Sequence, residues 1–280
     1  MSDKEKKYFL VKLRFHLGYS IRKSFTSGSI DSYIIPPKST IIGAIAMANS
    51  ARNGIHSEYL YDNAGEIYSN AYKYKDCIKY IAYNYEYKPI NFMSMTRMSI
   101  LLYAVRKEHL EESIKRVYNT RFGPLYLGMT SYYNELLKVF LVIENERGCK
   151  ITLNKKDLYS ITRLGSKESV VSVVEVLELN QNNIEKISKK HKIHNIKFSF
   201  PSDMKGIDLS SMSGSYFIEN VIEDEKGITY SFNVALQTSS LIIKTYIVPN
   251  PIVSITSTGN ESLCLFKTTE GNIIAPGELC

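Results

Sequence analysis

YFLVKLRFH, residues 8–16, is the stretch that decides the fold class, because apolar side chains recur there at every second position. One face of the expected strand carries four apolar side chains: Phe9, Val11, Leu13 and Phe15. The opposite face includes Lys12, Arg14 and His16. A period of two residues is typical of a strand with one buried face. The sequence therefore predicts a half-buried strand whose second face is basic.

The residues after this strand predict a helix and then a return to β structure. Pro36-Pro37 stops extended structure, and Ser39 or Thr40 is expected to cap the helix that follows. The later segments are predicted from their periodicity, in chain order, as strand-like sequence at 78–106, a helix at 107–119, strands at 136–144 and 170–179, a short basic helix at 182–194, a hairpin of 215–222 with 228–236, and a strand at 241–248.

This order of elements predicts an α+β fold. Strand, helix, strands, helix and strand suit a ferredoxin-like sheet of the RRM type. The last third is predicted to be mostly strands, so a smaller C-terminal β-rich domain is expected. We expect residues 1–180 to form the first domain and residues 181–280 to form the second. The 15 Gly and 8 Pro never cluster, so no flexible linker is expected between the two.

The composition of the 280 residues favours an anionic partner. There are 35 Lys and Arg against 28 Asp and Glu, which gives a formal net charge of +7. A basic balance favours polyanions, although many basic proteins bind none. The 21 Tyr and 11 Phe add rings that can stack on unpaired bases, although most are expected in the core. Nucleic acid is therefore one class of partner that the composition favours.

The cysteines and the hydropathy argue against several classes of protein. The four cysteines have no C-x-x-C spacing, so no zinc site is expected, and no other metal or cofactor is predicted. The longest uncharged apolar stretch, residues 39–51, is too short to cross a bilayer. The charged N-terminus does not resemble a signal peptide. We therefore expect a cytoplasmic protein with reduced thiols and no membrane contact.

RLGSKES, residues 163–169, has the composition of an anion-binding loop. Gly165 allows backbone N–H groups to converge on one point. Four side chains supply further donors: Arg163, Ser166, Lys167 and Ser169. A polar turn that merely connects two strands has the same composition. Composition alone leaves both interpretations open.

Two further basic residues are candidates for RNA contact. Lys38 lies in PPKST, residues 36–40, which ends like a P-loop but lacks its glycines, so ATP binding is rejected. The N-terminus of the expected helix can still meet a backbone phosphate, although simple capping explains the same residues. Arg121 precedes FGPLYLG, residues 122–128, whose turn formers and two rings can present it to RNA or merely connect two elements.

A lysine-rich segment keeps an enzymatic alternative open. His191 lies between Lys190 and Lys192. A histidine that acts as acid or base, beside a lysine that stabilises an anionic transition state, suits metal-independent RNA cleavage. A solvated basic helix face has the same residues, and no partner residue is identifiable. No catalytic residue is therefore predicted.

Three of these segments resemble the Cas five family of CRISPR-associated proteins, which belongs to the RAMP superfamily. IPPKSTIIGA, residues 35–44, is similar to the N-terminal region of that family. FGPLYLG, residues 122–128, is similar to its mid-chain element. RLGSKES, residues 163–169, resembles its glycine-rich loop in the form of archaeal type I-A members. The last third of the chain carries no motif that matches.

The resemblance implies a modified RRM fold and a role in antiviral defence. A subunit of this family caps the 5′ handle of the guide RNA in a Cascade-type complex, beside the repeated backbone subunit and the large subunit. The family's RNA-gripping loop corresponds here to Gly165, Ser166, Lys167 and Ser169, with Arg163 beside them. One subtype cuts the guide precursor with Tyr, Lys and His, and that full set cannot be placed in this sequence.

We therefore expect a non-catalytic RNA-binding subunit of a type I CRISPR surveillance complex. A metal-independent endoribonuclease that matures the guide precursor is the alternative. A general RNA-binding protein outside CRISPR is a third hypothesis.

Overall fold

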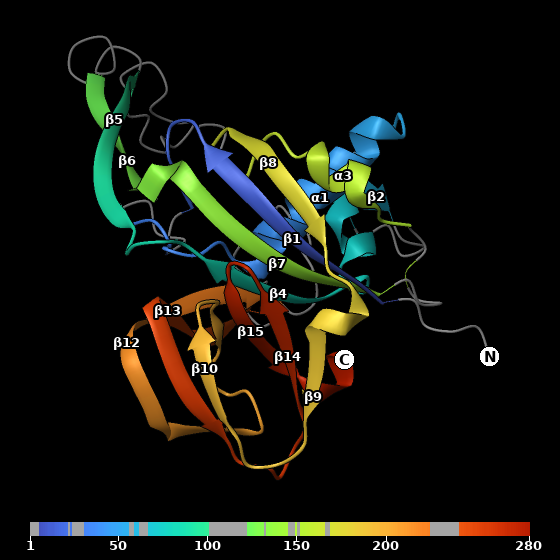
Figure 1. The fold of residues 1–280 in the computed structure, drawn as a ribbon. Helices are drawn as coiled ribbons and strands as arrows, with labels where there is room; N and C mark the ends of the chain where they lie inside the picture. Colours follow the sequence, from blue (N-terminus) through green and yellow to red (C-terminus); the bar gives the residue numbers. More distant parts are fainter. Residues whose placement is uncertain are drawn as a thin grey trace.

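The computed structural model forms two main β-sheets, one from the N-terminal part of the chain and one from the C-terminal part (Figure 1). The residues that it describes are 6–21, 23, 31–55, 59–61, 67–100, 122–131, 133–144, 149, 152–165, 169–224 and 241–280. Among these residues the α-helices are α1 (Lys38–Arg52) and α3 (Lys155–Tyr159). The fold is therefore mostly β, with less helix than the predicted α+β class implied.

The first sheet has four antiparallel strands with β1 in its interior. In spatial order the strands are β4 (Ile78–Asn84), β7 (Leu136–Glu144), β1 (Lys6–Phe15) and β8 (Val171–Glu178). Val11 of β1 pairs with Val139 of β7 on one side and with Val176 of β8 on the other. Along the chain, α1 lies between β1 and β4, and α3 lies between β7 and β8. The structure confirms three predicted strands: residues 8–16, 136–144 and 170–179.

Helix α1 covers one face of this sheet. The four apolar side chains of β1 share a buried cluster with Ile41, Ile42 and Ile45 of α1. The helix begins directly after its N-cap, Pro37, and no side chain caps it. The predicted cap at Ser39 or Thr40 is wrong, because the fixed φ of Pro37 is compatible with a helix that starts at the next residue. No helix in the described ranges is long and apolar enough to span a membrane.

A two-stranded sheet extends from one end of the first sheet (Figure 1). It pairs β5 (Ile90–Ile100) with β6 (Phe122–Ser131). Residues 122–128 are therefore strand, although turn formers had suggested a connection. Pro124 is tolerated because β6 is an edge strand of this pair. The helix predicted at 107–119 and Arg121 lie outside the described residues.

Among the residues that the structure describes, the short elements are a second small sheet and several 3₁₀ turns. The sheet pairs β2 (Tyr59–Tyr61) with β3 (Ile67–Ser69). The 3₁₀ turns are η1 (Asn70–Tyr74), η3 (Tyr133–Glu135), η4 (Gln181–Asn183) and η7 (Gly277–Leu279).

The second main sheet has seven strands and contains the lysine-rich segment. Its strands are β9 (Ile184–Ile187), β10 (Lys192–Ile196), β11 (Phe200–Pro201), β12 (Ile207–Asp224), β13 (Leu241–Ser257), β14 (Leu263–Thr268) and β15 (Gly271–Pro276). The helix predicted at 182–194 is wrong, because this segment supplies β9 and β10. Ile187 and Ile193 are buried in the core of the sheet, and this packing outweighs local helix propensity.

Two long strands form one side of the second sheet. β12 and β13 pair antiparallel, from Ile207 opposite Ser257 to Asp224 opposite Leu241. The strands predicted at 215–222 and 241–248 are therefore confirmed. The hairpin partner predicted at 228–236 lies outside the described residues.

The second face of β1 is divided between the second sheet and solvent. Tyr8 and Leu10 are buried against the C-terminal strands, and the Tyr8 ring centroid lies 5.1 Å from that of Phe266 in β14. Further along the strand, Arg14 and the following His16 are exposed. The predicted basic face is therefore found only in the second half of β1. The first half of this face is closed by the C-terminal strands.

The turn between β14 and β15 joins the two main sheets through charged side chains. Glu270 forms ion pairs with Lys12 of β1 at 2.6 Å and with Lys138 of β7 at 2.5 Å. Asn84 of β4 donates its side-chain N–H to the carbonyl oxygen of Glu270 at 3.3 Å. Lys12 also pairs with Glu175 of β8 at 2.9 Å. This turn is thus linked directly to β1, β7 and β4, and through Lys12 to β8.

We expect Glu270→Gln to lower the free energy of unfolding by about 2 kcal/mol at neutral pH, because charge-assisted hydrogen bonds are lost. Burial raises the pKa of Glu270, but the hydrogen bonds and charges of Lys12 and Lys138 outweigh burial and hold the pKa below its ordinary value of 4.5. A depressed pKa stabilises the fold above that value, and the contribution is lost as pH falls through the folded pKa. Urea unfolding at several pH values should therefore show the two proteins converging in acid. A difference in the free energy of unfolding that stays the same at every pH would contradict the prediction.

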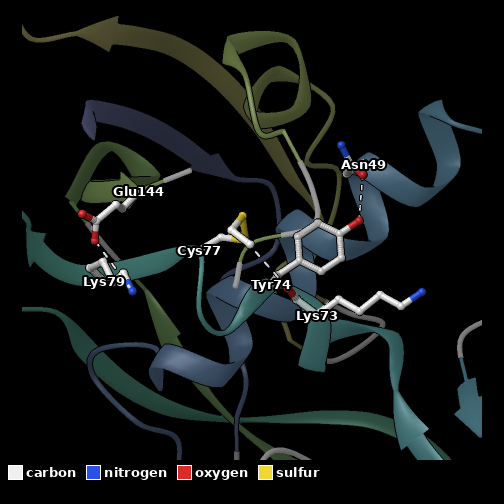
Figure 2. Close-up of a disulfide and its surroundings, with 7 residues drawn as sticks. Asn49, Lys73, Tyr74, Cys77, Lys79 and Glu144 are labelled. Atoms are coloured by element: carbon white, nitrogen blue, oxygen red, sulfur yellow. Dashed lines mark hydrogen bonds and ion pairs between the residues drawn. A yellow bond between two sulfur atoms is a disulfide. The ribbon is translucent and has the colours of Figure 1, made fainter. Parts of the chain in front are cut away.

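The four cysteines form two disulfides, Cys77–Cys149 and Cys264–Cys280. The expectation of reduced thiols is therefore wrong. The sequence did not reveal the pairs, because the fold brings together cysteines that are 72 and 16 residues apart. Figure 2 shows Cys77 beside Tyr74, whose hydroxyl donates to Asn49 Oδ1 of α1 at 2.7 Å. The first disulfide thus ties the start of β4 to the chain that follows β7.

Candidate nucleic-acid interface

The glycine loop, residues 163–169, is closed at its base by backbone pairing. Arg163 pairs with Val170 in a β-bridge. Leu164 N–H donates to the carbonyl oxygen of Ser169 at 3.0 Å. Because β8 begins immediately afterwards, both ends of the loop are attached to the first sheet.

Gly165 permits a close approach between this loop and the chain that leaves β1. Its φ of +92° lies in the left-handed region. A Cβ at this position would lie 2.8 Å from Ile21 Cγ1 and 3.4 Å from the carbonyl oxygen of Ser20. Any other residue would add both a contact that is too short and an unfavourable φ. Gly165 was singled out in the sequence for its backbone freedom, and its positive φ makes use of that freedom.

Ser169 holds the loop against the same segment. Its side chain is fully buried, and its Oγ accepts a hydrogen bond from Ser20 N–H at 2.9 Å. The hydroxyl of Ser20 in turn donates to the carbonyl oxygen of Gly128 in β6 at 2.7 Å. The structure thus gives Ser169 an internal role, and a direct contact between Ser169 and RNA stays a prediction. Ser166 and Lys167 lie outside the described residues.

Residues 16–21 connect the glycine loop to the β5–β6 sheet. Tyr19 N–H donates to the carbonyl oxygen of Thr130 at 2.9 Å, and Thr130 N–H donates back at 2.7 Å. Sequence reasoning missed Ser20 and Thr130, because neither belongs to a recognisable motif. Gly18 in the sequence indicates a turn at this point, and its φ in the structure is +89°. It does not indicate which residues the turn contacts.

Three polar or basic side chains border the base of the loop. Arg163 is exposed, and its guanidinium lies 3.7 Å from the sulfur of Met47 in α1. Arg14 is exposed on β1 opposite Ser172 of β8. The exposed His16 shares a hydrogen bond of 2.7 Å between its Nε2 and Ser172 Oγ. The structure therefore places His16 beside the base of the loop, where its N–H donates to the carbonyl oxygen of Val170. Arg14 lies on the face of β1 that points away from α1, whereas Arg163, the residue that the sequence had singled out, contacts α1.

Lys38 lies apart from the glycine loop. Its amine donates to the carbonyl oxygen of Lys79 in β4 at 3.5 Å. β4 and β8 are the opposite edges of the first sheet, and the loop adjoins β8. Burial lowers the pKa of Lys38, and neighbouring lysines lower it further against the opposing effect of Glu223. The structure therefore does not bring Lys38 and the loop into one site.

The lysine-rich segment also lies apart from the loop, in the second sheet. Lys190, His191 and Lys192 are exposed. Ser257 fixes the backbone of this segment, because its Oγ accepts from His191 N–H at 2.9 Å and donates to the carbonyl oxygen of Lys189 at 2.8 Å. In the ranges that the structure describes, no group of three or more His, Cys, Asp or Glu could hold a metal ion.

A similar arrangement of the backbone occurs in the crystal structure of a CRISPR protein from Archaeoglobus fulgidus. The TM-score is 0.55, and the match covers 96% of this chain and 99% of that chain. The two chains share a fold. Only 18% of the residues are identical, so the likeness concerns the fold and not the side chains. No protein-family model matches this sequence, and no curated protein matches it.

Proposed function

We propose that this chain is a non-catalytic RNA-binding subunit of a type I CRISPR surveillance (Cascade-type) complex. Its role would be to cap the 5′ handle of the guide RNA. The observation that carries the proposal is the fold, which matches that of a CRISPR protein over almost the full length of both chains.

The geometry of the glycine loop supports RNA binding at this point. Gly165 and Ser169 lie against Ile21 and Ser20, so these two loop residues are held in place by the chain that leaves β1. Arg163 adds positive charge at the base of the loop, and Arg14 lies on β1 opposite Ser172, two residues after Val170. Backbone N–H groups together with basic side chains are the usual means of holding phosphates.

The strand order supports a modified ferredoxin-like, RAMP-type sheet. In chain order the four strands are β1, β4, β7 and β8, and in space they follow the order second, third, first, fourth. A helix follows the first strand and another follows the third. This is the order expected of two βαβ halves in one antiparallel sheet. The C-terminal strands cover the first half of the β1 face that carries Tyr8 and Leu10. This favours RNA contacts at the edge of the first sheet over stacking of bases across the whole sheet.

Exposed apolar side chains support assembly with other subunits. Ile90, Phe92 and Met93 at the start of β5 have exposed fractions of 69%, 42% and 62%. Figure 1 shows that β5 and β6 project away from the second sheet. Such side chains are common at protein interfaces. The partners in this proposal are the repeated backbone subunit, the large subunit and the guide RNA.

Purification of the tagged chain together with its genomic neighbours, followed by sequencing of bound RNA, tests the proposal. We expect small RNAs that share one repeat-derived 5′ end, and a particle larger than the chain alone. Bound RNA without repeat sequence would favour a general RNA-binding protein. A homogeneous homo-oligomer that ignores the other subunits would contradict the proposal.

We expect no cleavage of repeat RNA by the purified chain, either with EDTA or with divalent metal. His191 and its lysine neighbours lie on an exposed segment of the second sheet, away from the glycine loop. Gel analysis of labelled repeat RNA, with His191→Ala as the matched variant, measures this. Specific cleavage that His191→Ala abolishes would establish the endoribonuclease alternative instead.

A further inference from the structure

The face of β1 that points away from α1 changes along the strand from covered to open. Tyr8 and Leu10, at its start, are buried against the C-terminal strands. Lys12 follows them and already has two ion pairs, with carboxylates of β8 and of the turn before β15. Arg14 and His16, at the end of this face, are exposed. The open end of the face is therefore basic.

Three exposed side chains lie next to one another at this open end, and we call them the strand-end cluster: Arg14, His16 and Ser172 of β8. Arg14 is the register partner of Ser172, and opposed residues of antiparallel strands project from the same face. His16 reaches the same hydroxyl, because its Nε2 lies 2.7 Å from Ser172 Oγ. The backbone is fixed here as well, since His16 N–H donates to the carbonyl oxygen of Val170 at 3.1 Å.

The strand-end cluster has no carboxylate partner among the residues that the structure describes, where neither Arg14 nor His16 forms an ion pair. The charged side chains of the surrounding elements are Lys12 of β1, Lys138 of β7, Glu135 of η3, Glu175 of β8 and Glu270 of the turn before β15. Two of these three carboxylates are already engaged by the two lysines. Exposed cations in this state are suited to an anion that arrives from outside.

The hydrogen bond between His16 and Ser172 links the cluster to the proton on the imidazole. In an imidazolium both ring nitrogens donate, so Ser172 Oγ accepts from Nε2 and its own hydrogen is free for a ligand. In a neutral ring whose Nε2 carries no proton, the hydroxyl donates to the ring instead. Protonation thus supplies a positive charge and frees a hydroxyl donor at the same place.

We propose that the strand-end cluster binds a phosphate group of single-stranded RNA, in a contact that depends on the protonation of His16 and is separate from the glycine loop. A guanidinium suits phosphate oxygens, and the imidazolium and hydroxyl add donors. The identity of the anion as RNA rests on the proposed function and on position. Ser172 lies two residues, about 7 Å of extended strand, after Val170, which pairs with Arg163 at the base of the glycine loop. An acidic segment of a partner protein is the competing ligand.

His16→Gln tests the role of the proton, because glutamine can still hydrogen-bond to Ser172 but cannot become charged. The measurement is the affinity of the full chain for a labelled single-stranded RNA, whose phosphodiester groups keep their charge throughout. As the pH rises from about 5.5 to about 8, where histidine side chains ordinarily lose their charge, the unaltered chain should lose about fivefold in affinity. This is the size of one exposed charge contact. His16→Gln should show no such loss, whereas His191→Gln, the matched control at another exposed histidine, should retain it.

Arg14→Gln tests the fixed charge in a salt titration of the same RNA. It should weaken binding at every pH and reduce the slope of log K against log salt by about 0.7 on single strands. Ser172→Ala removes only the hydroxyl, so it should weaken binding mainly at low pH. Lys205→Gln removes an exposed charge in the turn before β12 and is the matched control, which should keep the slope. Thermal unfolding confirms that each variant folds.

A pH dependence that persists in His16→Gln, or an unchanged slope in Arg14→Gln, would overturn the inference. If Arg14→Gln binds RNA normally but no longer binds a purified partner subunit, the cluster is a protein contact and the inference is wrong too. Gly165→Val in the same titration separates the two proposals. If only Gly165→Val loses affinity, the strand-end cluster is wrong and the proposed function stands. If the unaltered chain binds no RNA, both fail.

Discussion

Gly165→Val is expected to weaken binding of the 5′ handle RNA at least about tenfold, a free-energy loss of about 1.4 kcal/mol or more, without removing any charge. A valine Cβ would lie 2.8 Å from Ile21 Cγ1. The φ of +92° is also one that a β-branched residue resists, at a cost of about 1–3 kcal/mol. The loop must therefore move away from residues 20–21, which changes the backbone at the position proposed to hold phosphate. A titration of labelled handle RNA with the assembled complex measures the loss.

Gly54→Val is the matched control for this variant. Gly54 also has a positive φ, +67°, but a Cβ there would meet nothing within 4 Å. Gly54→Val should lower the stability somewhat, because valine resists a positive φ, and it should keep the affinity for RNA. Circular dichroism confirms that both variants fold. Lys190→Ala should have little effect and should act alike on all RNAs. If Gly165→Val binds RNA normally and Lys190→Ala loses its affinity, the glycine loop is not the RNA-binding site. The RNA contact would then be assigned to the lysine-rich segment.

Lys167→Ala tests the charge of the same loop independently of its shape. If Lys167 contacts a phosphate, its loss should lower the salt dependence by about 0.7 in slope on single strands. A reduced affinity with an unchanged slope would instead point to altered loop shape.

Removal of the Cys77–Cys149 disulfide is expected to lower the free energy of unfolding by about 4 kcal/mol. A cross-link stabilises chiefly by restricting the unfolded chain, and its effect grows with the length of the closed loop. Here the bonded residues are 72 apart. The Cys264–Cys280 pair closes a loop of 16 residues and should contribute about 3 kcal/mol.

Urea unfolding of Cys77→Ala, Cys149→Ala and the double variant measures this contribution. Each single variant should lose as much stability as the double variant, because either substitution breaks the same bond. Cys264→Ala, measured alongside, serves as the control for the shorter loop. An unfolding midpoint of the unaltered chain that does not change under strong reductant would contradict both estimates.

Regular periodicity made much of the first sheet predictable. β1 and β7 were predicted to within two residues, since their apolar side chains either alternate or run continuously. Helix α1 ends at Arg52, directly before Asn53 and Gly54, and both are residue types that commonly follow a helix. Local sequence was sufficient for these elements, because each one buries a face that its own residues define.

Long-range packing decided the features that the sequence could not predict. Residues 182–194 have helix-like polarity, yet Ile187 and Ile193 are buried in a sheet where β9 and β10 pair with strands that come much later in the chain. In the candidate site, the sequence singled out Gly165 because glycine has a free backbone. The close approach of Gly165 to Ile21 could not be predicted, because the two residues are 144 positions apart in the chain. The disulfides were missed for the same reason.

The way in which the second sheet covers β1 limits how this chain could be divided or recombined. A fragment that ended after β8 would expose Tyr8 and Leu10 as an adhesive apolar patch. It would also leave Lys12 and Lys138 without the carboxylate of Glu270. The first sheet and its cover are thus not modules that can be exchanged freely between proteins. A C-terminal sheet from another protein could replace the present one only if it supplied two features. These are an apolar surface that fits Tyr8 and Leu10 and a carboxylate at the position of Glu270.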